Sequence, residues 1–213
     1  MSNKIELLEA ARKRYEMMPH LKLACTNCKM CELGWRSATR GNDVHDPHVF
    51  SNYDPIVDPA QFMIVGQNPG WNELKAQTPF VGLAGKNFDT ELDKTFWKRS
   101  DFYISNAVKC YTEGNKPPQQ RNLAACEPFL RMEIAIIKPR LVVAFGAVAF
   151  SVLCDTKFSD NIGKITTSEK FGVKVFTTYH PSPLNLQDVA KKKQFAHDVA
   201  MIAKMLNYYL TPF

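Results

Sequence analysis

Four short apolar segments alternate with longer segments of helical periodicity, and this alternation constrains the fold more than any other feature. The apolar segments are Phe62–Val65, Phe102–Val108, Leu141–Phe145 and Val173–Tyr179. Apolar runs of this length between helices are typical of strands buried in a parallel sheet. The pattern predicts a three-layer α/β/α sandwich around a central, mainly parallel four-stranded sheet.

Five segments have the spacing of amphipathic or buried helices. They are Lys4–Met17, Gly82–Arg99, Gln120–Ile137, Ala147–Cys154 and Asn185–Leu210. The third should end at Lys138, because the following Pro139 cannot continue a helix. A chain of 213 residues suits one compact domain, and we expect residues 1–213 to form it.

Ligands of open α/β sheets bind beyond the carboxyl ends of the strands. The first loop to follow a strand, Gly66–Gly70, holds two glycines and a proline around Gln67 and Asn68. Its backbone could approach a ligand closely, and either polar side chain could hold a water molecule. An ordinary turn after a strand would have much the same composition.

Two further loops carry polar side chains at strand ends. The amide of Asn106 could read the edge of a pyrimidine, or it could tie the loop to its neighbours. His180 is followed by Pro181 and Pro183, which would hold its ring in a stiff loop against developing negative charge. The alternative for His180 is a surface turn.

Four cysteines lie near these loops: Cys25 and Cys28 in a C-x-x-C pair, and Cys110 and Cys126 separated by fifteen residues. Met1–Ala10 does not resemble a secretory signal, so we expect an intracellular, cytoplasmic protein in which metal binding is commoner than disulfides. The split second pair favours an iron–sulfur cluster, with zinc and unligated cysteines as alternatives. Cys31 is a possible substitute ligand, and Cys154 is expected in the core.

The formal net charge of +6 suggests an anionic partner, for which nucleic acid is the commonest case. A basic surface that is merely solvated would have the same composition. The apolar runs are all too short to span a bilayer, so no membrane partner is expected.

Taken together and in order, these residues resemble the uracil-DNA glycosylase superfamily, and most of all its family four, the iron–sulfur enzymes. The resemblance extends from Cys25 to about Leu186. The blocks that carry it are Cys25-x-x-Cys28, Gly66–Gly70, Pro79–Gly85, Asn106-x-Val108-Lys109-Cys110, Cys126, Lys138-Pro139 before a strand that ends at Gly146, and His180-Pro181.

The resemblance implies a monofunctional, monomeric DNA-repair glycosylase that acts on DNA containing uracil or another deaminated base. It implies a [4Fe–4S] cluster held by Cys25, Cys28, Cys110 and Cys126. It also implies that Gly66, Phe80 and Asn106 bind the base, that His180 stabilises the departing uracil anion, and that Ser182 and Leu184 contact DNA, the leucine as a wedge.

One loop departs from the family-four pattern. Gln67 stands where that family has a glutamate that activates water, and Asn68 matches the asparagine that positions water in the mismatch-specific and single-strand-selective families. We therefore expect Asn68, Gln67 and His180 to be catalytic. Three alternatives stay open: a superfamily member that binds DNA or protein without excision, a glycosylase for another deaminated or damaged base, and a zinc-stabilised interaction module.

Overall fold

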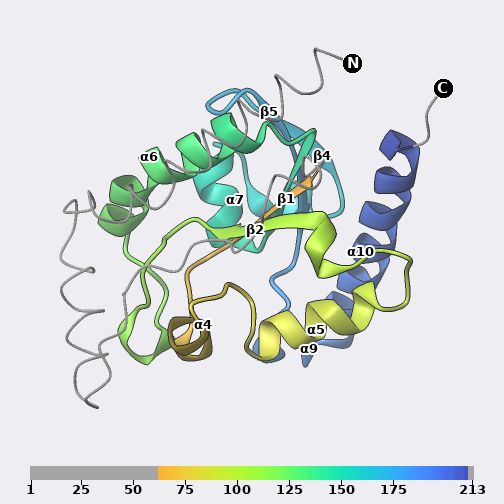
Figure 1. The fold of residues 1–213 in the computed structure, drawn as a ribbon, viewed down its shortest axis with the longest axis horizontal. Helices are drawn as coiled ribbons and strands as arrows, with labels where there is room; N and C mark the ends of the chain where they lie inside the picture. Colours follow the sequence, from red (N-terminus) through yellow and green to blue (C-terminus); the bar gives the residue numbers. More distant parts are fainter. Residues whose placement is uncertain (1–61, 211–213) are drawn as a thin grey trace, which may run out of the picture.

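The computed structural model describes residues 62–210, and Figure 1 shows their arrangement. The helix expected at Lys4–Met17 and the cysteines Cys25, Cys28 and Cys31 lie outside the described residues. Within them, a central sheet is covered by helices on both faces, as the alternating pattern predicts.

The sheet has five strands in the order β2-β1-β3-β5-β4. Four of them are parallel and agree with the predicted strands; they are β1 (Phe62–Gly66), β2 (Phe102–Asn106), β3 (Leu141–Phe145) and β5 (Val173–Thr178). The fifth, β4 (Ile165–Ser168), pairs antiparallel with β5 at the edge. The predicted count of four strands is therefore wrong by one, because β4 is polar, largely exposed and without an apolar run.

Alternate strand residues point to opposite layers of the sandwich. Met63 and Val142 belong to a buried cluster with α6 (Gln120–Ile137) and α7 (Ala147–Leu153). Phe62 and Val143 belong to a second cluster with α5 (Leu83–Leu92) and α10 (Val189–Leu210). The strands are apolar on both faces because each face is covered by a helical layer.

Short elements connect these layers. They are α4 (Trp71–Ala76), α8 (Phe158–Asn161), α9 (Pro183–Leu186) and the 3-10 turns η1 (Arg99–Asp101) and η2 (Glu113–Asn115). The helix expected at Asn185–Leu210 is divided into α9 and α10. The division falls at Asp188, whose carboxylate accepts hydrogen bonds from the backbone N–H groups of Ala190 and Lys191.

Other predicted bounds agree closely. The helix Gln120–Ile137 and the strand Leu141–Phe145 coincide with α6 and β3. The helix expected at Gly82–Arg99 ends earlier, at Leu92, and the strand expected at Phe102–Val108 ends at Asn106. None of the helices in the described part of the chain combines the length and apolarity needed to cross a bilayer.

Candidate active site

Gly66, Phe80 and Asn106 form a cradle at the carboxyl ends of β1 and β2. Parallel pairing places Gly66 and Asn106 side by side in register. A Cβ added to Gly66 would lie 2.4 Å from Cζ of Phe80 and 2.5 Å from Oδ1 of Asn106, so only glycine lets the two side chains close over this strand end. We call these three residues the cradle.

The Asn106 amide is buried, and its Oδ1 has no hydrogen-bond partner among the described residues. An unpaired buried acceptor is costly, and its persistence in a strand-end cradle is typical of a site that receives a donor from a ligand. The cradle is thus suited to a flat molecule that carries an N–H group.

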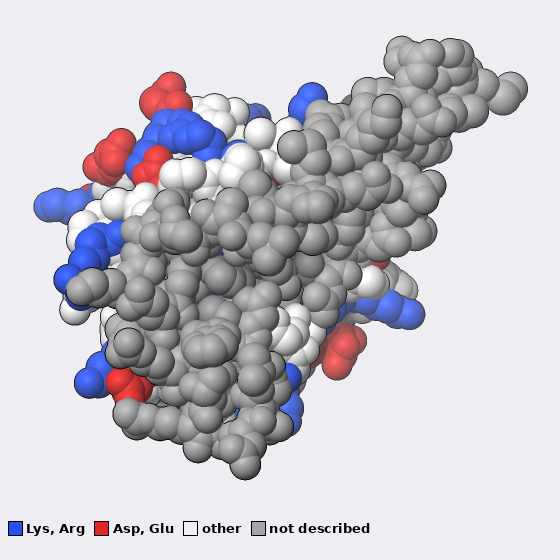
Figure 2. Space-filling model, turned by 60° about the vertical axis from the view of Figure 1, so that its left-hand side comes forward, with Lys and Arg blue, Asp and Glu red and all other residues white. Residues whose placement is uncertain are grey.

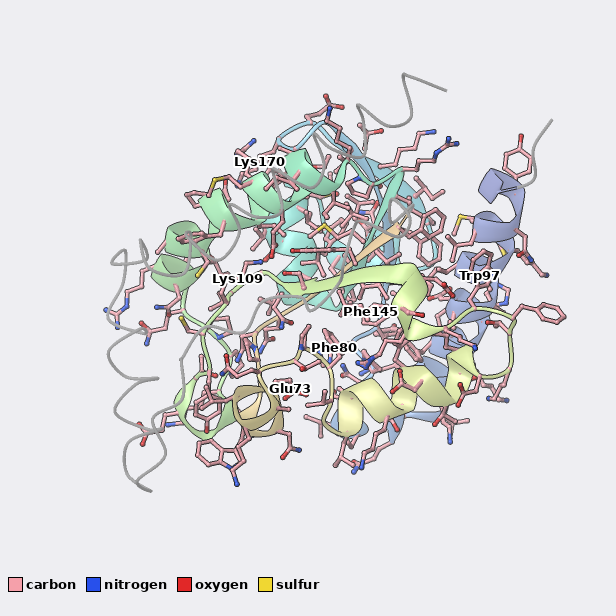
Figure 3. All side chains as sticks on the ribbon, viewed as in Figure 1. Glu73, Phe80, Trp97, Lys109, Phe145 and Lys170 are labelled. Carbon is pink, nitrogen blue, oxygen red and sulfur yellow. The ribbon has the colours of Figure 1, made fainter. Side chains whose placement is uncertain are left out.

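Phe80 is positioned by aromatic neighbours. Its ring lies 5.8 Å from the ring of Phe145 in an edge arrangement and 5.8 Å from the imidazole of His180, tilted by 36°. Figure 3 shows Phe80 between Phe145 on the sheet side and Glu73 on the α4 side. The structure therefore brings together the predicted residues Gly66, Asn106 and His180 from three strand ends and Phe80 from the loop between α4 and α5.

His180 follows β5 and packs against the end of β3. Gly146 has φ of +91°, and a Cβ at this position would lie 2.8 Å from the Cβ of His180. The backbone N–H of Gly146 donates to the carbonyl oxygen of Thr178, two residues before the histidine. The close approach of these two strand ends fixes the backbone from which the imidazole projects.

Burial lowers the pKa of His180 from 6.5 to about 4, although part of the residue is exposed. The apolar rings beside the imidazole cannot solvate a cation, so the neutral form is favoured. At pH 7 the ring is therefore neutral, with one nitrogen a donor and the other an acceptor. The N–H of this neutral ring can donate a hydrogen bond to an anion.

Gln67 and Asn68 form a short hydrogen-bonded chain beside the cradle. Gln67 Nε2 donates to Asn68 Oδ1 over 2.8 Å, and Asn68 Nδ2 donates to the hydroxyl of Thr112 over 2.9 Å and to the carbonyl of Pro69 over 3.0 Å. The Asn68 amide is therefore held in one orientation. Its Oδ1 keeps a second lone pair that could accept from water.

Glu73, in α4, joins the Gly66–Gly70 loop to the loop that carries Phe80. Its Oε2 accepts from the N–H of Gly70 over 3.0 Å and its Oε1 accepts from the N–H of Gly82 over 2.6 Å. Both oxygens are thus engaged with the backbone, which makes Glu73 a brace and not a carboxylate base for water. The signal for this role was a glutamate three residues after a helix-starting glycine, as in a capping box.

A buried ion pair joins Lys109, three residues after Asn106 and labelled in Figure 3, to Glu133 of α6. Lys109 Nζ is 2.5 Å from Glu133 Oε2, and neither side chain is more than 1% exposed. The same Nζ donates to the carbonyl oxygen of Asn106 over 2.6 Å and to Ser105 Oγ over 2.9 Å. Tyr103 and Ser105 donate to Glu133 as well, so the polar atoms of the pair are satisfied.

Two predicted DNA contacts lie at the start of α9. Leu184 is 79% exposed, as an inserting side chain must be, and Ser182 Oγ accepts from the N–H of Asn185 and caps the helix. The Asn87 amide of α5 donates to the carbonyl of Pro181 over 2.9 Å, which ties this loop to the helix that follows Phe80. In Figure 2, the basic and acidic side chains of the described residues that are visible lie interspersed, mainly around the margin of the view.

Cys110 and Cys126 are both buried in the cluster between the sheet and α6. The described residues contain no group of three or more cysteine, histidine or acidic side chains able to hold a metal ion. The other two predicted ligands, Cys25 and Cys28, lie outside the described residues. Cys154 lies in the same apolar cluster, and burial raises its pKa to about 11, in agreement with its predicted place in the core.

A sheet of this topology, with an aromatic ring, an unpaired amide and a neutral imidazole gathered beyond its strand ends, defines a protein that binds a flat, hydrogen-bonding ring at the carboxyl edge. Comparison with known families agrees with this class. The family model described as "Uracil DNA glycosylase superfamily" matches residues 55–203. This chain belongs to that superfamily.

Individual relatives are similar over most of the same region. The chain is 36% identical to "Type-4 uracil-DNA glycosylase" of Pyrobaculum aerophilum over 147 residues, which are 65% of this chain and 74% of the relative. It is 37% identical to the enzyme of that name from Thermotoga maritima over 150 residues, 64% of this chain and 78% of the relative. "Type-5 uracil-DNA glycosylase" of Pyrobaculum aerophilum is 33% identical over 128 residues, 58% of this chain and 54% of the relative.

Proposed function

We propose that this protein is a monofunctional DNA glycosylase that takes uracil, flipped out of DNA, into the cradle and hydrolyses its N-glycosidic bond. Uracil in DNA arises from deaminated cytosine, so the reaction is a step of base-excision repair. The observation that carries the proposal is the buried, unpaired Oδ1 of Asn106 beside the Phe80 ring. The names of the similar proteins support the same activity.

The cradle accounts for a choice of base. Uracil presents an N–H donor at N3 beside a carbonyl acceptor at C4, whereas cytosine presents an acceptor at N3 and an amino donor at C4. The Asn106 amide matches uracil when Oδ1 accepts from N3–H and Nδ2 donates to the C4 carbonyl. Phe80 supplies a ring on which the flipped base stacks, which offsets part of the cost of unstacking it from the duplex.

The bond to be broken leaves negative charge on the base and positive character on the sugar. His180, neutral at pH 7, donates a hydrogen bond to a carbonyl oxygen of the departing base and so stabilises the negative charge. The base leaves as an anion and a water molecule attacks the sugar carbon. The proton that this water loses passes to the departed anion through solvent, so the products are neutral uracil and an abasic sugar.

The water is positioned by Asn68, whose Oδ1 accepts a hydrogen bond from the water while Gln67 and Thr112 hold the amide in place. An amide cannot take the proton as a carboxylate base would. Asn68 therefore contributes by orientation, with most of the barrier lowered by charge stabilisation on the base.

Excision is tested on a panel of oligonucleotides containing uracil, hypoxanthine, cytosine or thymine, each followed by alkali cleavage of the abasic product. We expect cleavage of the uracil substrate. Excision of another base and not of uracil would show that the proposed substrate is wrong. Retarded migration in a gel without cleavage would show a DNA-binding protein that does not excise.

Two substitutions test the assigned roles. Asn68→Ala should slow single-turnover excision by about tenfold or more, as loss of a group that orients a reactant does. Asn106→Ala should reduce the preference for uracil over cytosine. Asn161→Ala is the matched control, because this exposed amide hydrogen-bonds Lys157 and Thr156, away from the cradle. Excision by Asn68→Ala at the wild-type rate would rule out its role.

We further propose that Cys110 and Cys126, together with Cys25 and Cys28, ligate a [4Fe–4S] cluster. Both described thiols are buried in the same part of the hydrophobic core, between β2 and α6, which supports this donor set. Four thiolates suit a soft metal centre. When bound, the cluster supplies a covalent brace between the segment that follows Asn106 and helix α6. Zinc is the less favoured occupant.

The cofactor proposal is tested on purified protein by absorption in the visible blue and by assay of iron, acid-labile sulfide and zinc. We expect iron and sulfide in the wild type and their loss in Cys126→Ser. Cys154→Ser is the control, since this core thiol is not assigned to the cluster, and it should retain both. Zinc in place of iron would overturn the assignment.

We also propose that the chain acts as a single domain and a monomer, with Leu184 filling the stack left by the flipped base and Ser182 contacting a backbone phosphate. The exposure of Leu184 beside the His180 loop supports the wedge. Leu184→Ala should slow excision from duplex DNA more than from single-stranded DNA. Equal effects on both substrates would count against a wedge.

A further inference from the structure

Phe80 has an unusual backbone for an aromatic residue. Its φ is +56°, in the left-handed region that residues other than glycine rarely adopt. Its carbonyl lies against the first turn of α5, where a Cβ on Gly85 would be 1.6 Å from the carbonyl oxygen. The ring is therefore carried on a strained backbone that needs an outside contact to hold it.

Arg99 provides that contact from a distant part of the sequence. Its guanidinium donates to the carbonyl oxygen of Phe80 through Nη1 over 2.6 Å and through Nη2, and Nη2 also donates to the carbonyl of Pro79 over 3.3 Å. The Asp89 carboxylate of α5 lies 3.5 Å from Nη1 and helps to orient the guanidinium. One planar side chain thus satisfies two consecutive carbonyls of the strained loop.

The position of Arg99 links the Phe80 ring, the stacking platform for the base, to Asn106, the residue proposed to read the base. It lies in η1, which leads directly into β2, and β2 ends at Asn106. The loop is also held from its far side by Glu73, which accepts from the N–H of Gly82. The loop is thus fixed at two points: the Arg99 guanidinium binds the carbonyl of Phe80, and the Glu73 carboxylate binds the N–H of Gly82.

We propose that Arg99 is a positioning residue for uracil recognition: it holds Phe80 in the left-handed conformation in which the ring faces the base. The inference rests on the proposed function. Arg99 does not touch the base, and it acts only through the platform.

The test compares Arg99→Met with Arg131→Met. Arg131 is a close match, because it too donates to a backbone carbonyl, that of Lys170 over 2.7 Å, and pairs with a carboxylate, Glu127, at 3.1 Å. Both arginines are partly exposed, with 29% and 49% of the side chain accessible, so neither change leaves a buried charge. Only Arg99 lies at the cradle.

Three readouts separate positioning from a general structural role. Arg99→Met should weaken inhibition by free uracil about tenfold, within the range expected for lost base–aromatic stacking. Its binding to DNA that already carries an abasic site should stay within about twofold of wild type, because no base occupies the cradle there. Arg99→Lys should restore part of the uracil binding, since one donor still reaches the carbonyl.

A double-mutant cycle decides whether Arg99 acts through Phe80. In a Phe80→Ala background, Arg99→Met should add less than about a twofold loss of excision rate, because the platform is already absent. A full multiplicative loss in that background would overturn the proposal, as would unchanged uracil inhibition in the single variant.

One measurement is independent of activity. The ring resonances of Phe80, assigned by their absence in Phe80→Leu, should shift in Arg99→Met and stay in place in Arg131→Met, since the ring lies against Phe145 and His180. Unchanged resonances in Arg99→Met would overturn the inference. Failure of the wild type to excise uracil, with the shift observed, would overturn the proposed function alone.

Discussion

Gly146 lies so close to His180 that a Cβ on the glycine would be 2.8 Å from the Cβ of the histidine. The glycine directly follows β3 and the histidine follows β5, so their contact sets how far the imidazole projects from the sheet edge. The imidazole proposed to be catalytic is therefore placed by the absence of a side chain beyond the end of another strand.

Gly146→Ala should slow uracil excision by about tenfold or more, because a displacement of a catalytic group of the order of 1 Å has effects of that size or larger. It should also cost about 1 to 3 kcal/mol of stability, since φ of +91° is unfavourable for alanine. The control is Gly172→Ala, which has φ of +64° and no atom within 4 Å of an added Cβ. Denaturant unfolding should show destabilisation of both variants, larger for Gly146→Ala, and single-turnover rates should show slower excision only for Gly146→Ala.

The low pKa of His180 predicts the acid side of the pH profile. Because the folded pKa of about 4 lies below the unfolded value of 6.5, the folded state binds fewer protons between these values, and stability falls as pH drops from 6.5 toward 4. Excision should show no loss due to His180 between pH 7.5 and about 5.5, where the ring stays neutral. Nuclear magnetic resonance titration of the ring checks the value, and an apparent pKa near 6.5 would contradict the prediction.

Glu73→Gln should loosen the contact between the two loops. The amide keeps one oxygen acceptor and turns an NH2 group toward a backbone donor, so one hydrogen bond is replaced by repulsion. We expect a loss of about 1 to 3 kcal/mol in stability and slower excision. Glu91→Gln, which removes a surface pair with Lys94, should cost no more than about 1 kcal/mol and leave excision unchanged. Equal effects of the two changes would show that Glu73 does not brace the site.

The buried pair Lys109–Glu133 predicts a partner-dependent effect. Lys109→Met leaves the Glu133 carboxylate buried without its cation, and should destabilise the fold by about 3 to 5 kcal/mol. Adding Glu133→Leu should recover a large part of this stability, because no buried charge is left. Urea unfolding of the single and double variants measures the recovery. A double variant no more stable than the single one would mean that packing, and not charge, holds this region.

Much of this architecture could be predicted because it depends on local signals. Apolar runs ending in glycine marked β1 and β3, and a helical pattern followed by Lys138-Pro139 marked α6 to its bounds. The edge strand β4 lacked such a signal, since Ile165 and Thr167 face solvent. The strand is held by pairing with β5 and by hydrogen bonds from the hydroxyl groups of Thr166 and Ser168.

The candidate site also has parts that local sequence signals predict and parts that they do not. Gly66 and Asn106 end strands and His180 follows one, so the rule that ligands bind at strand ends marked them as candidates, and the resemblance to the family gave them roles. The contacts that position them come from residues far apart in sequence. Arg99 is 19 residues from the carbonyl that it binds, and Glu133 is 24 residues from Lys109. Neither contact has a spacing that a sequence pattern could reveal.

The order β2-β1-β3-β5-β4 distributes the site over loops from several strands, and each loop has supporting contacts of its own. Asn106, at the end of β2, is supported by Lys109, His180 by Gly146 directly after β3, and Asn68 by Thr112. On the proposed assignment, the amide that positions water and the residues that read the base therefore depend on different contacts, so one can change while much of the support for the other is kept. A superfamily built in this way can keep one recognition apparatus while its members diverge in how they hydrolyse the bond.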